Sequence, residues 1–247
     1  MKIGLLQCDD LAPSLRQTYG NYPELYERLL RSAEPNATIE VWRVHEGELP
    51  EDLLAADVWL ISGSKASVYE AHPWIAELVD FVCLLWDSRR PLIGICFGHQ
   101  LICKALGGVV ERSHKGWGLG VSFNQVVKQR RWMSPWQERL GLVVSHQDQV
   151  IELPPVGEVI AESAFCPNYV VEYRERFLGI QGHPEFSRAL SRDLMKLRDS
   201  VLCPIRLREG VASLEAQTDD ALMARWMVDF YYHALAEAQS YALVRSA

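Results

Sequence analysis

The sequence lacks an excess of positive charge and any long basic run. Its 247 residues include 25 Lys and Arg against 32 Asp and Glu, which gives a formal net charge of −7. Proteins that bind polyanions need clustered positive charge, so the composition argues against a nucleic-acid partner. We interpret the acidity as the ordinary surface charge of a soluble protein.

Paired or metal-ligating cysteines are also missing. The six cysteines form no CxxC pair and no His/Cys spacing typical of a metal site, and several lie inside apolar runs. A free cysteine in such a run behaves as a small hydrophobic residue, which favours a reducing compartment over secretion. We therefore expect neither a metal nor another cofactor.

Targeting and membrane-spanning segments are absent as well. The N-terminus has one basic residue and a short apolar stretch before Asp9 and Asp10, unlike a signal peptide. No apolar stretch is long enough to cross a bilayer. The expectation is a cytoplasmic protein that does not contact a membrane.

The first hundred residues do contain a regular alternation of strand-like and helical patterns. The expected elements are strands at 2–7, 37–44, 57–62 and 91–95 and helices at 22–32 and 74–88. This alternation predicts an α/β fold with a flavodoxin-like, doubly wound and mostly parallel sheet. Later strand-like runs at 119–128, 141–145, 159–164, 169–173 and 177–181 predict antiparallel hairpins at the sheet edge, with the last strand returning to the core.

The end of the chain is helical in pattern. Helices are expected at 187–200 and 219–239, and the second is expected to pack on the domain. No repeat or Pro/Gly-rich linker interrupts the sequence, so we expect one domain over 1–247, with a catalytic core at 1–186 and a helical extension at 187–247. The Trp-containing stretch 130–136 is left open as a lid, a dimer contact or a packed turn.

A buried strand that runs into Gly94-Ile95-Cys96-Phe97-Gly98 and a helix at 99–106 has the form of a nucleophile elbow with cysteine at its tip. The sharp reversal brings backbones into contact, which requires glycine at both flanking positions. At a helix N-terminus the Cys96 sulfur would be favoured as a thiolate, and the N–H of Phe97 would bind an oxyanion. A buried structural cysteine at a tight turn has the same pattern. The interpretation of Cys96 as a nucleophile therefore needs a second motif that supplies a base.

A second motif, Phe177 to Phe186, supplies that base. Its strand ends at Gly182, which places His183 at the sheet edge where α/β proteins bind ligands. Glu185 can orient the imidazole toward the sulfur, which predicts a Cys96–His183–Glu185 triad. His99 is expected to point away from the sulfur and His146 to line the substrate pocket. The remaining histidines are interpreted as structural or surface residues: His45, His72, His114 and His233.

At these residues the chain resembles the class I (triad) glutamine amidotransferase family, over roughly residues 1–186. The motifs that carry the resemblance are GICFGHQ at the elbow, GIQGHPEF at the base, ISGS and SHQD. The resemblance implies the flavodoxin-like sheet, the Cys-His-Glu triad and a γ-glutamyl thioester intermediate. It also implies that Gln100 holds the amino-acid end of the substrate and that the backbone at Gly63 and Ser64 gives a second oxyanion donor.

The sequence departs from the family at one loop, where Gly63-Ser64-Lys65 replaces the Gly-Gly-Pro of many members. A backbone donor survives that change if φ stays negative. The Gly-Ser form and KGWGLG at 115–120 are closer to γ-glutamyl peptidase-like members. The residues after Glu185 are too few for an ATP-dependent partner domain, and no GxxxxGK[ST] loop occurs.

Three functions stay open on the sequence, all with glutamine or a γ-glutamyl small molecule as the ligand. The chain could be a glutaminase subunit that passes ammonia to a synthetase or acceptor subunit. It could be a standalone γ-glutamyl peptidase, or an inactive binding or regulatory homologue. The leaving group, the acceptor and the oligomeric state, a homodimer included, are not decided by the sequence.

Overall fold

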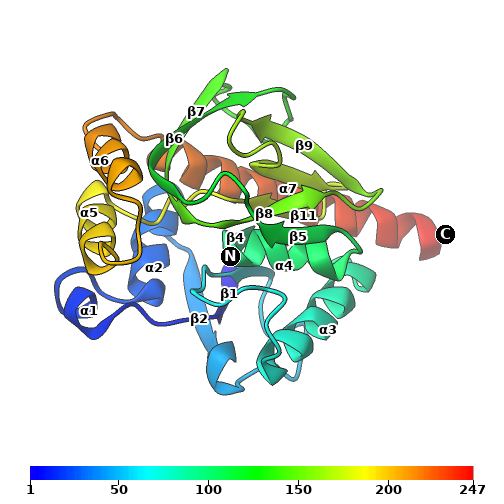
Figure 1. Cartoon of the computed structure of the whole chain (residues 1–247). Coiled ribbons are helices and arrows are strands. Elements are labelled where there is room, and N and C mark those ends of the chain that lie inside the picture. The colour runs from blue at the N-terminus through cyan, green and yellow to red at the C-terminus, as the bar shows by residue number, and fades with distance from the viewer. Residues whose placement is uncertain (247) are drawn as a thin grey trace.

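The computed structural model describes the backbone of residues 1–246 and the side chains of residues 1–241. Figure 1 shows one large twisted sheet with helices packed on both faces. Its strands are β1 (Lys2–Gln7), β2 (Thr38–Arg43), β3 (Val58–Ile61), β4 (Leu92–Ile95), β6 (Gly118–Val126), β7 (Arg139–His146), β9 (Gly157–Glu162), β10 (Val170–Tyr173) and β11 (Phe177–Ile180). They lie in the order β2-β1-β3-β4-β11-β10-β9-β6-β7.

The sheet changes from parallel to antiparallel at β11. The neighbours β2, β1, β3, β4 and β11 all run parallel. Strands β10, β9, β6 and β7 then continue the sheet in antiparallel pairs. The predicted fold class, a doubly wound sheet with antiparallel edge hairpins, is confirmed. Two short strands were not predicted, β5 (Val109–Arg112) and β8 (Asp148–Glu152), which form a separate two-stranded sheet.

The helices divide between the two faces. They are α1 (Pro13–Tyr19), α2 (Tyr22–Ala33), α3 (Pro73–Asp87), α4 (Phe97–Ala105), α5 (Arg188–Leu197), α6 (Pro204–Ser213) and α7 (Asp220–Ser246). One apolar core joins α2 and α7 to one set of strand side chains, and a second joins α3 and α4 to the alternate set. Successive strand residues point to opposite faces, so strands buried on both sides read as continuous apolar runs.

Helix α7 is part of the core. Trp226, Phe230 and Tyr231 are buried, and the Tyr231 hydroxyl donates a hydrogen bond of 2.7 Å to the backbone oxygen of Trp59 in β3. The predicted packing of this helix on the domain is therefore what the structure has. The helix extends beyond the predicted end at residue 239, and Ala247 lies outside the described residues. None of the helices in the described part of the chain is long and apolar enough to cross a membrane.

The stretch 130–136 includes a packed turn. Trp132 is buried, its indole N–H donates to Glu172 Oε1 at 2.7 Å, and its ring meets Trp226 and Phe230 of α7 edge-on. Because Glu172 also accepts from Arg130 at 2.6 Å, the turn is tied to β10 by two hydrogen bonds. This stretch was left open as a lid, a dimer contact or a packed turn, and the structure shows Trp132 in a packed turn.

Candidate active site

The predicted elbow is present where β4 turns into α4. Cys96 occupies the turn with φ of 51° and ψ of −96°, a strained conformation for a residue with a side chain. A Cβ at Gly94 would collide with the backbone of Gly98, and one at Gly98 would lie 2.7 Å from the oxygen of Ile61 in β3. The helix begins at Phe97, two residues before the predicted start, because the reversal takes place at Cys96 alone.

The elbow brings Cys96 to the imidazole that follows β11. Strands β4 and β11 are parallel neighbours, so their carboxyl ends meet at one edge of the sheet. Cys96 lies next to His183 and influences its charge, and His183 Nδ1 bonds to Glu185 Oε1 at 2.7 Å. All three side chains are buried. The structure thus places the three predicted residues in contact, in the order sulfur, imidazole, carboxylate.

The charge on the imidazole follows from these neighbours. Burial alone lowers the pKa of His183, but the charges of Glu185 and Cys96, with their hydrogen bonds, outweigh it and raise the pKa to about 10. At neutral pH the ring is therefore an imidazolium beside the sulfur. A positively charged neighbour of this kind is typical of the surroundings of reactive cysteines.

Aromatic side chains fix the imidazole in place. The ring of Phe186 stacks on His183 with centroids 4.2 Å apart and planes 6° apart. On the carboxylate side, the Tyr26 hydroxyl donates to Glu185 Oε1 at 3.1 Å. Burial raises the pKa of Tyr26 well above its usual value, so the phenol remains a hydrogen-bond donor. Glu185 Oε1 therefore receives two hydrogen bonds, one from the ring and one from the phenol.

Two glutamines connect the sulfur to the neighbouring backbone. Gln100 Nε2 donates to the backbone oxygen of Asp148 at 2.9 Å and to Gln181 Oε1 at 3.1 Å. Gln181 Nε2 in turn donates to Cys96 Sγ at 3.4 Å. The carbonyl of Asp148 can only accept, so it sets the orientation of both amides. Both N–H groups of Gln100 are used, which leaves its Oε1 as the atom available to a ligand.

Two histidines, His146 and His99, lie near the elbow. His146 lines a cavity beside Cys96, and its Nδ1 bonds to the backbone oxygen of Asp148 at 3.1 Å. Burial lowers the pKa of His146 to about 4, so the ring is neutral. His99 is fully buried and packs so tightly over Gly179 of β11 that a Cβ there would collide with its ring.

Backbone donors for an oxyanion are available beside the sulfur. The N–H of Phe97 is the first of α4 and has no acceptor within the helix. In the loop after β3, Gly63 lies close to the hydroxyl of Tyr26 in α2. Ser64 lines the cavity beside Cys96, whereas Gly63 packs against the His183 ring. Of the two predicted loop positions, Ser64 is the one that faces the open space.

Two cavities meet at this centre. The first cavity, about 280 Å³, is lined by Cys96, Phe97, Gln100, His146 and Asp148 among others. The second cavity, about 330 Å³, lies on the His183 side and is bounded by the loop after β1, by α1 and by α5. Their shared boundary is formed by Ser64, Lys65, Ser145 and Arg198. A bound molecule can therefore extend to either side of the sulfur.

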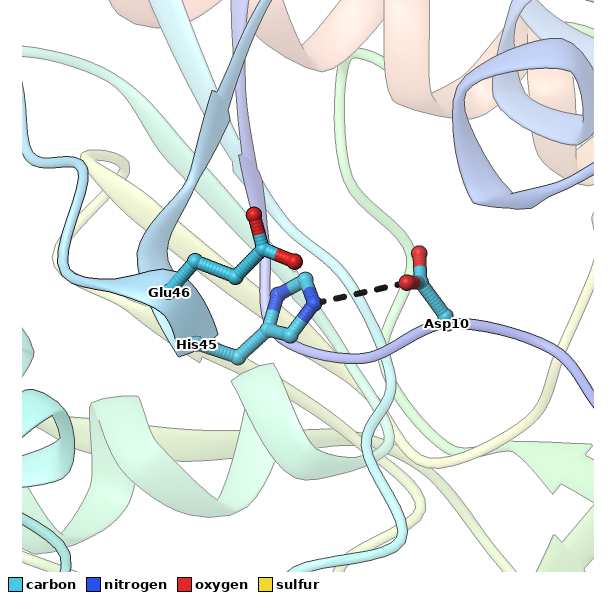
Figure 2. A group of neighbouring side chains, drawn as sticks. All are labelled: Asp10, His45 and Glu46. Atoms are coloured by element: carbon cyan, nitrogen blue, oxygen red, sulfur yellow. Dashed lines mark ion pairs between the residues drawn. The ribbon is translucent and has the colours of Figure 1, made fainter.

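A group of possible metal ligands lies close to the second cavity. Figure 2 shows Asp10, His45 and Glu46, with His45 Nε2 at 3.7 Å from Asp10 Oδ2. The guanidinium of Arg43 bonds to both carboxylates, at 2.8 Å and 2.7 Å. Because Arg43 already neutralises the acids, we interpret the group as a structural ion-pair network.

Several residues of the site were missed by the sequence reasoning. Gln181, Tyr26 and Phe186 contact the reacting groups, and Arg198 and Ser145 border both cavities. Gln181 and Phe186 lie inside the motif that identified His183, so their position could have suggested them. Tyr26 and Arg198 lie in distant helical segments, and only the packing of α2 and α5 against the sheet brings them near.

A search of protein-family models matches residues 18–199 to "Glutamine amidotransferase class-I". The chain is 32% identical over 210 residues to Gamma-glutamyl peptidase 4 of Arabidopsis thaliana, which covers 82% of each protein. It is 31% identical over 166 residues to a GMP synthase of Thermosynechococcus vestitus, and that match covers 66% of this chain but 29% of the synthase.

Among solved structures, a glutamine amidotransferase from Thermotoga maritima superimposes with a TM-score of 0.73. The superposition covers 96% of this chain and 98% of the other, at 18% identity. At that identity the likeness concerns the fold. The family match reaches Lys196 and Arg198 of α5 and its C-terminal turn, beyond the end of the resemblance seen in the sequence alone.

Proposed function

The chain belongs to the class-I glutamine amidotransferase family, and we propose on that basis that it hydrolyses a γ-glutamyl amide with Cys96 as nucleophile. The observation that carries the proposal is the buried contact of Cys96 with an imidazolium whose other nitrogen bonds to Glu185. The family and the relatives at this level of identity are hydrolase-type amidotransferases. The specific substrate and the intermediate below are our proposal.

In the first step the Cys96 thiolate attacks the δ-carbonyl carbon of the γ-glutamyl group. The carbonyl oxygen becomes an oxyanion, held by the backbone N–H groups of Phe97 and Ser64. His183 gives its proton to the amide nitrogen as the carbon–nitrogen bond breaks. A γ-glutamyl thioester on Cys96 and a free amine result.

In the second step a water molecule replaces the amine. Neutral His183, held in position by Glu185 and Phe186, takes a proton from this water as the oxygen attacks the thioester carbon. The carbon–sulfur bond breaks, and glutamate and the thiolate are regenerated. Glu185 carries no proton in this scheme and acts by orienting the ring and stabilising its charge.

The first cavity is proposed to hold the glutamyl group. Gln100 offers Oε1, a hydrogen-bond acceptor that suits an α-ammonium group. His146 is proposed as a neutral part of the cavity wall rather than as a charged ligand, since burial keeps its pKa low. Neither role requires a metal or a cofactor.

The share of each relative's length that this chain matches favours a peptidase over an ammonia-donating subunit. The peptidase relative is matched over 82% of its own length, whereas the match to GMP synthase covers 29% of that protein. We favour a standalone γ-glutamyl peptidase. A glutaminase that serves a synthetase or acceptor subunit is the second candidate, and the inactive homologue is third because all three triad positions are filled.

A reducing compartment is proposed for the chain. All six cysteines are free, and four of them, including Cys96, are buried. A free nucleophilic thiol of this kind works only where it is kept reduced. We propose the cytoplasm.

The test is the substitution Cys96→Ala together with Cys96→Ser. We expect glutamate release from glutamine and γ-glutamyl dipeptides to fall by at least about a thousandfold in both, because the nucleophile is removed. The control is Cys103→Ser, which changes another buried cysteine, in the helix that follows Cys96. Full activity in either Cys96 variant would exclude the scheme. Mass spectrometry of wild-type protein treated with a glutamine-analogue inactivator should place the label on Cys96.

A further inference from the structure

The second cavity is larger than the release of ammonia requires. Its volume is about 330 Å³, against roughly 30 Å³ for a molecule the size of water. It lies on the side of His183, the group that protonates the departing nitrogen in the proposed mechanism. The departing group must lie beside its acid, so this cavity is where the leaving group fits.

The positively charged side chains around the second cavity differ in whether an acidic side chain pairs with them. Lys65 pairs with Asp9 at 2.9 Å, and Arg16 lies 3.7 Å from Asp10. Arg198 forms no ion pair with an acidic side chain among residues 1–241, for which side chains are described. Its guanidinium donates to the hydroxyl of Ser145 at 3.0 Å and lies 5.5 Å from the centre of the Trp117 ring. It keeps a net positive charge at the cavity wall.

The position of Arg198 restricts what it can bind. It lies at the end of α5 and, with Ser64 and Ser145, borders both cavities, so it is close to the point where the scissile bond lies. An amino-acid leaving group carries its carboxylate one carbon away from the departing nitrogen. A guanidinium at this boundary matches that position and binds a carboxylate with two parallel hydrogen bonds.

The rest of the cavity wall is suited to an apolar side chain. Leu11, Phe186 and Leu194 are buried residues that line it, and Leu197 lines it while remaining half exposed to solvent. Figure 1 shows that α1 and α5, which provide two of its sides, lie next to each other at one end of the molecule. Helix α5 therefore contributes both the cation and part of the apolar surface.

Building on the proposed function, we propose that the second cavity binds the leaving group of a γ-glutamyl peptide, an α-amino acid with an apolar side chain whose carboxylate is bound by Arg198. Hydrolysis breaks the carbon–nitrogen bond, His183 supplies the proton to the nitrogen, and the free amino acid leaves through this cavity. Arg198 is a specificity-determining residue for the leaving group and not for the glutamyl group.

The experiment compares three substrates that share the glutamyl group: γ-glutamyl-leucine, γ-glutamyl-leucinamide and glutamine. The wild-type chain should cleave γ-glutamyl-leucine with a kcat/KM about ten- to a hundredfold above that of the leucinamide, which lacks the carboxylate. Arg198→Gln should abolish this preference and change the other two substrates by less than about threefold. Arg198→Lys should restore part of it, because the charge returns without the planar fork.

The matched control is Arg192→Gln on the same helix. Arg192 pairs with Glu215 and lines neither cavity, so all three substrates should behave as with the wild type. If Arg198→Gln lowered kcat/KM for glutamine as strongly as for γ-glutamyl-leucine, Arg198 would act on the glutamyl side and the inference would be overturned. Equal rates on the dipeptide and the leucinamide by the wild type would overturn it too.

Failure of the underlying function has a different signature. In that case the wild-type chain would release glutamate from none of the three substrates, and a glutamine-analogue inactivator would not label Cys96. An active chain that is labelled on Cys96 but makes no distinction between the dipeptide and its amide refutes only the assignment of the second cavity.

Discussion

At the scale of single residues, the His183 imidazole is held by contacts on several sides. Phe186 stacks on one face, Gly63 packs close to the ring, and Glu185 accepts from Nδ1. A Cβ at Gly63 would lie 2.9 Å from Cε1 of the ring, so glycine is needed there for the ring to take this position. Because Nδ1 is bonded to Glu185, Nε2 is the ring nitrogen left to face the sulfur.

The charge of His183 leads to a prediction on pH. Burial opposes the protonated ring, and the charge of Glu185 is the main influence that raises the pKa, to about 10. The imidazolium is needed to protonate the leaving amine, so kcat/KM should fall as the pH rises through about 10. Glu185→Gln should move this alkaline limb to lower pH, because the raising charge is lost while the size of the side chain is kept.

The measurement is a pH profile of kcat/KM for both proteins, with Glu175→Gln, an exposed acid far from Cys96 in the chain, as the control. An unmoved alkaline limb in Glu185→Gln would contradict the assignment of Glu185. The same sign applies to stability. The folded pKa of His183 lies above the unfolded value of about 6.5, so the stabilisation by its partners is complete below that pH and is lost as pH rises through about 10.

Gln181 leads to a second prediction at this scale. Its amide donates to Cys96 Sγ and accepts from Gln100, so it supports the thiolate and the cavity wall together. Gln181→Met keeps the length of the side chain but removes both bonds. We expect kcat/KM to fall by about ten- to a hundredfold, the size of one lost hydrogen bond to a charged group.

Alkylation of Cys96 by iodoacetamide distinguishes this role from a structural one. In Gln181→Met the rate should change, because the sulfur loses the hydrogen bond that Gln181 donates to it. An alkylation profile identical to that of the wild type would show that Gln181 acts only on packing.

At the scale of elements, the elbow depends on the close approach of α4 to β3 and β4. A Cβ at Gly98 would lie 2.8 Å from Cβ of Ile61, and neither backbone can move without shifting the sheet. Gly98→Ala should therefore displace the start of α4, lower the unfolding free energy by about 1–3 kcal/mol and reduce activity further than the loss of stability explains.

The control for this variant is Gly141→Ala in β7. A Cβ there would lie 3.3 Å from the ring of Phe123 and 3.5 Å from Asp219 Oδ2, and Phe123 is largely exposed and free to move. Thermal unfolding and glutamate release should both stay close to those of the wild type in the control. A Gly98→Ala protein with unchanged activity would mean that the elbow tolerates a side chain at its fifth position.

At the scale of the whole molecule, α7 ties the C-terminal residues to the sheet. Tyr231 is fully buried and bonds to the backbone of β3, and Trp226 and Phe230 pack on the turn at Trp132. We propose that residues 1–247 form one folding unit, in which the extension after residue 186 is an integral part. Helix α5, which carries Arg198 at its end, also belongs to that extension.

The substitution Tyr231→Phe tests whether the chain unfolds as one unit. The loss of the buried hydrogen bond should lower the unfolding free energy of the whole chain by about 1–3 kcal/mol, in a single transition that far-UV circular dichroism and tryptophan fluorescence report alike. Tyr232→Phe is the control, since the Tyr232 hydroxyl bonds to Glu34 at the surface and its loss should cost less than about 0.5 kcal/mol. Two separate transitions would contradict the single unit.

The α/β class, the positions of the main strands, the elbow turn and the proximity of Cys96, His183 and Glu185 were predictable from local sequence. Their signals are short-range: continuous apolar runs for strands buried on both faces, glycines on either side of a strained turn, and a histidine and a glutamate two positions apart. The short helices α1 and α6 and the strands β5 and β8 were not predicted, because segments of this length carry little periodicity.

The tertiary structure determined the contacts between residues that lie far apart in the sequence. Tyr26 reaches Glu185 across 159 positions in sequence, and Arg198 reaches Ser145 across 53. It also determined that Ser64 rather than Gly63 faces the first cavity and that a second cavity opens beside His183. Contacts of this kind depend on how helices pack on the sheet, and packing is set by the shapes of many side chains together, which no local pattern contains.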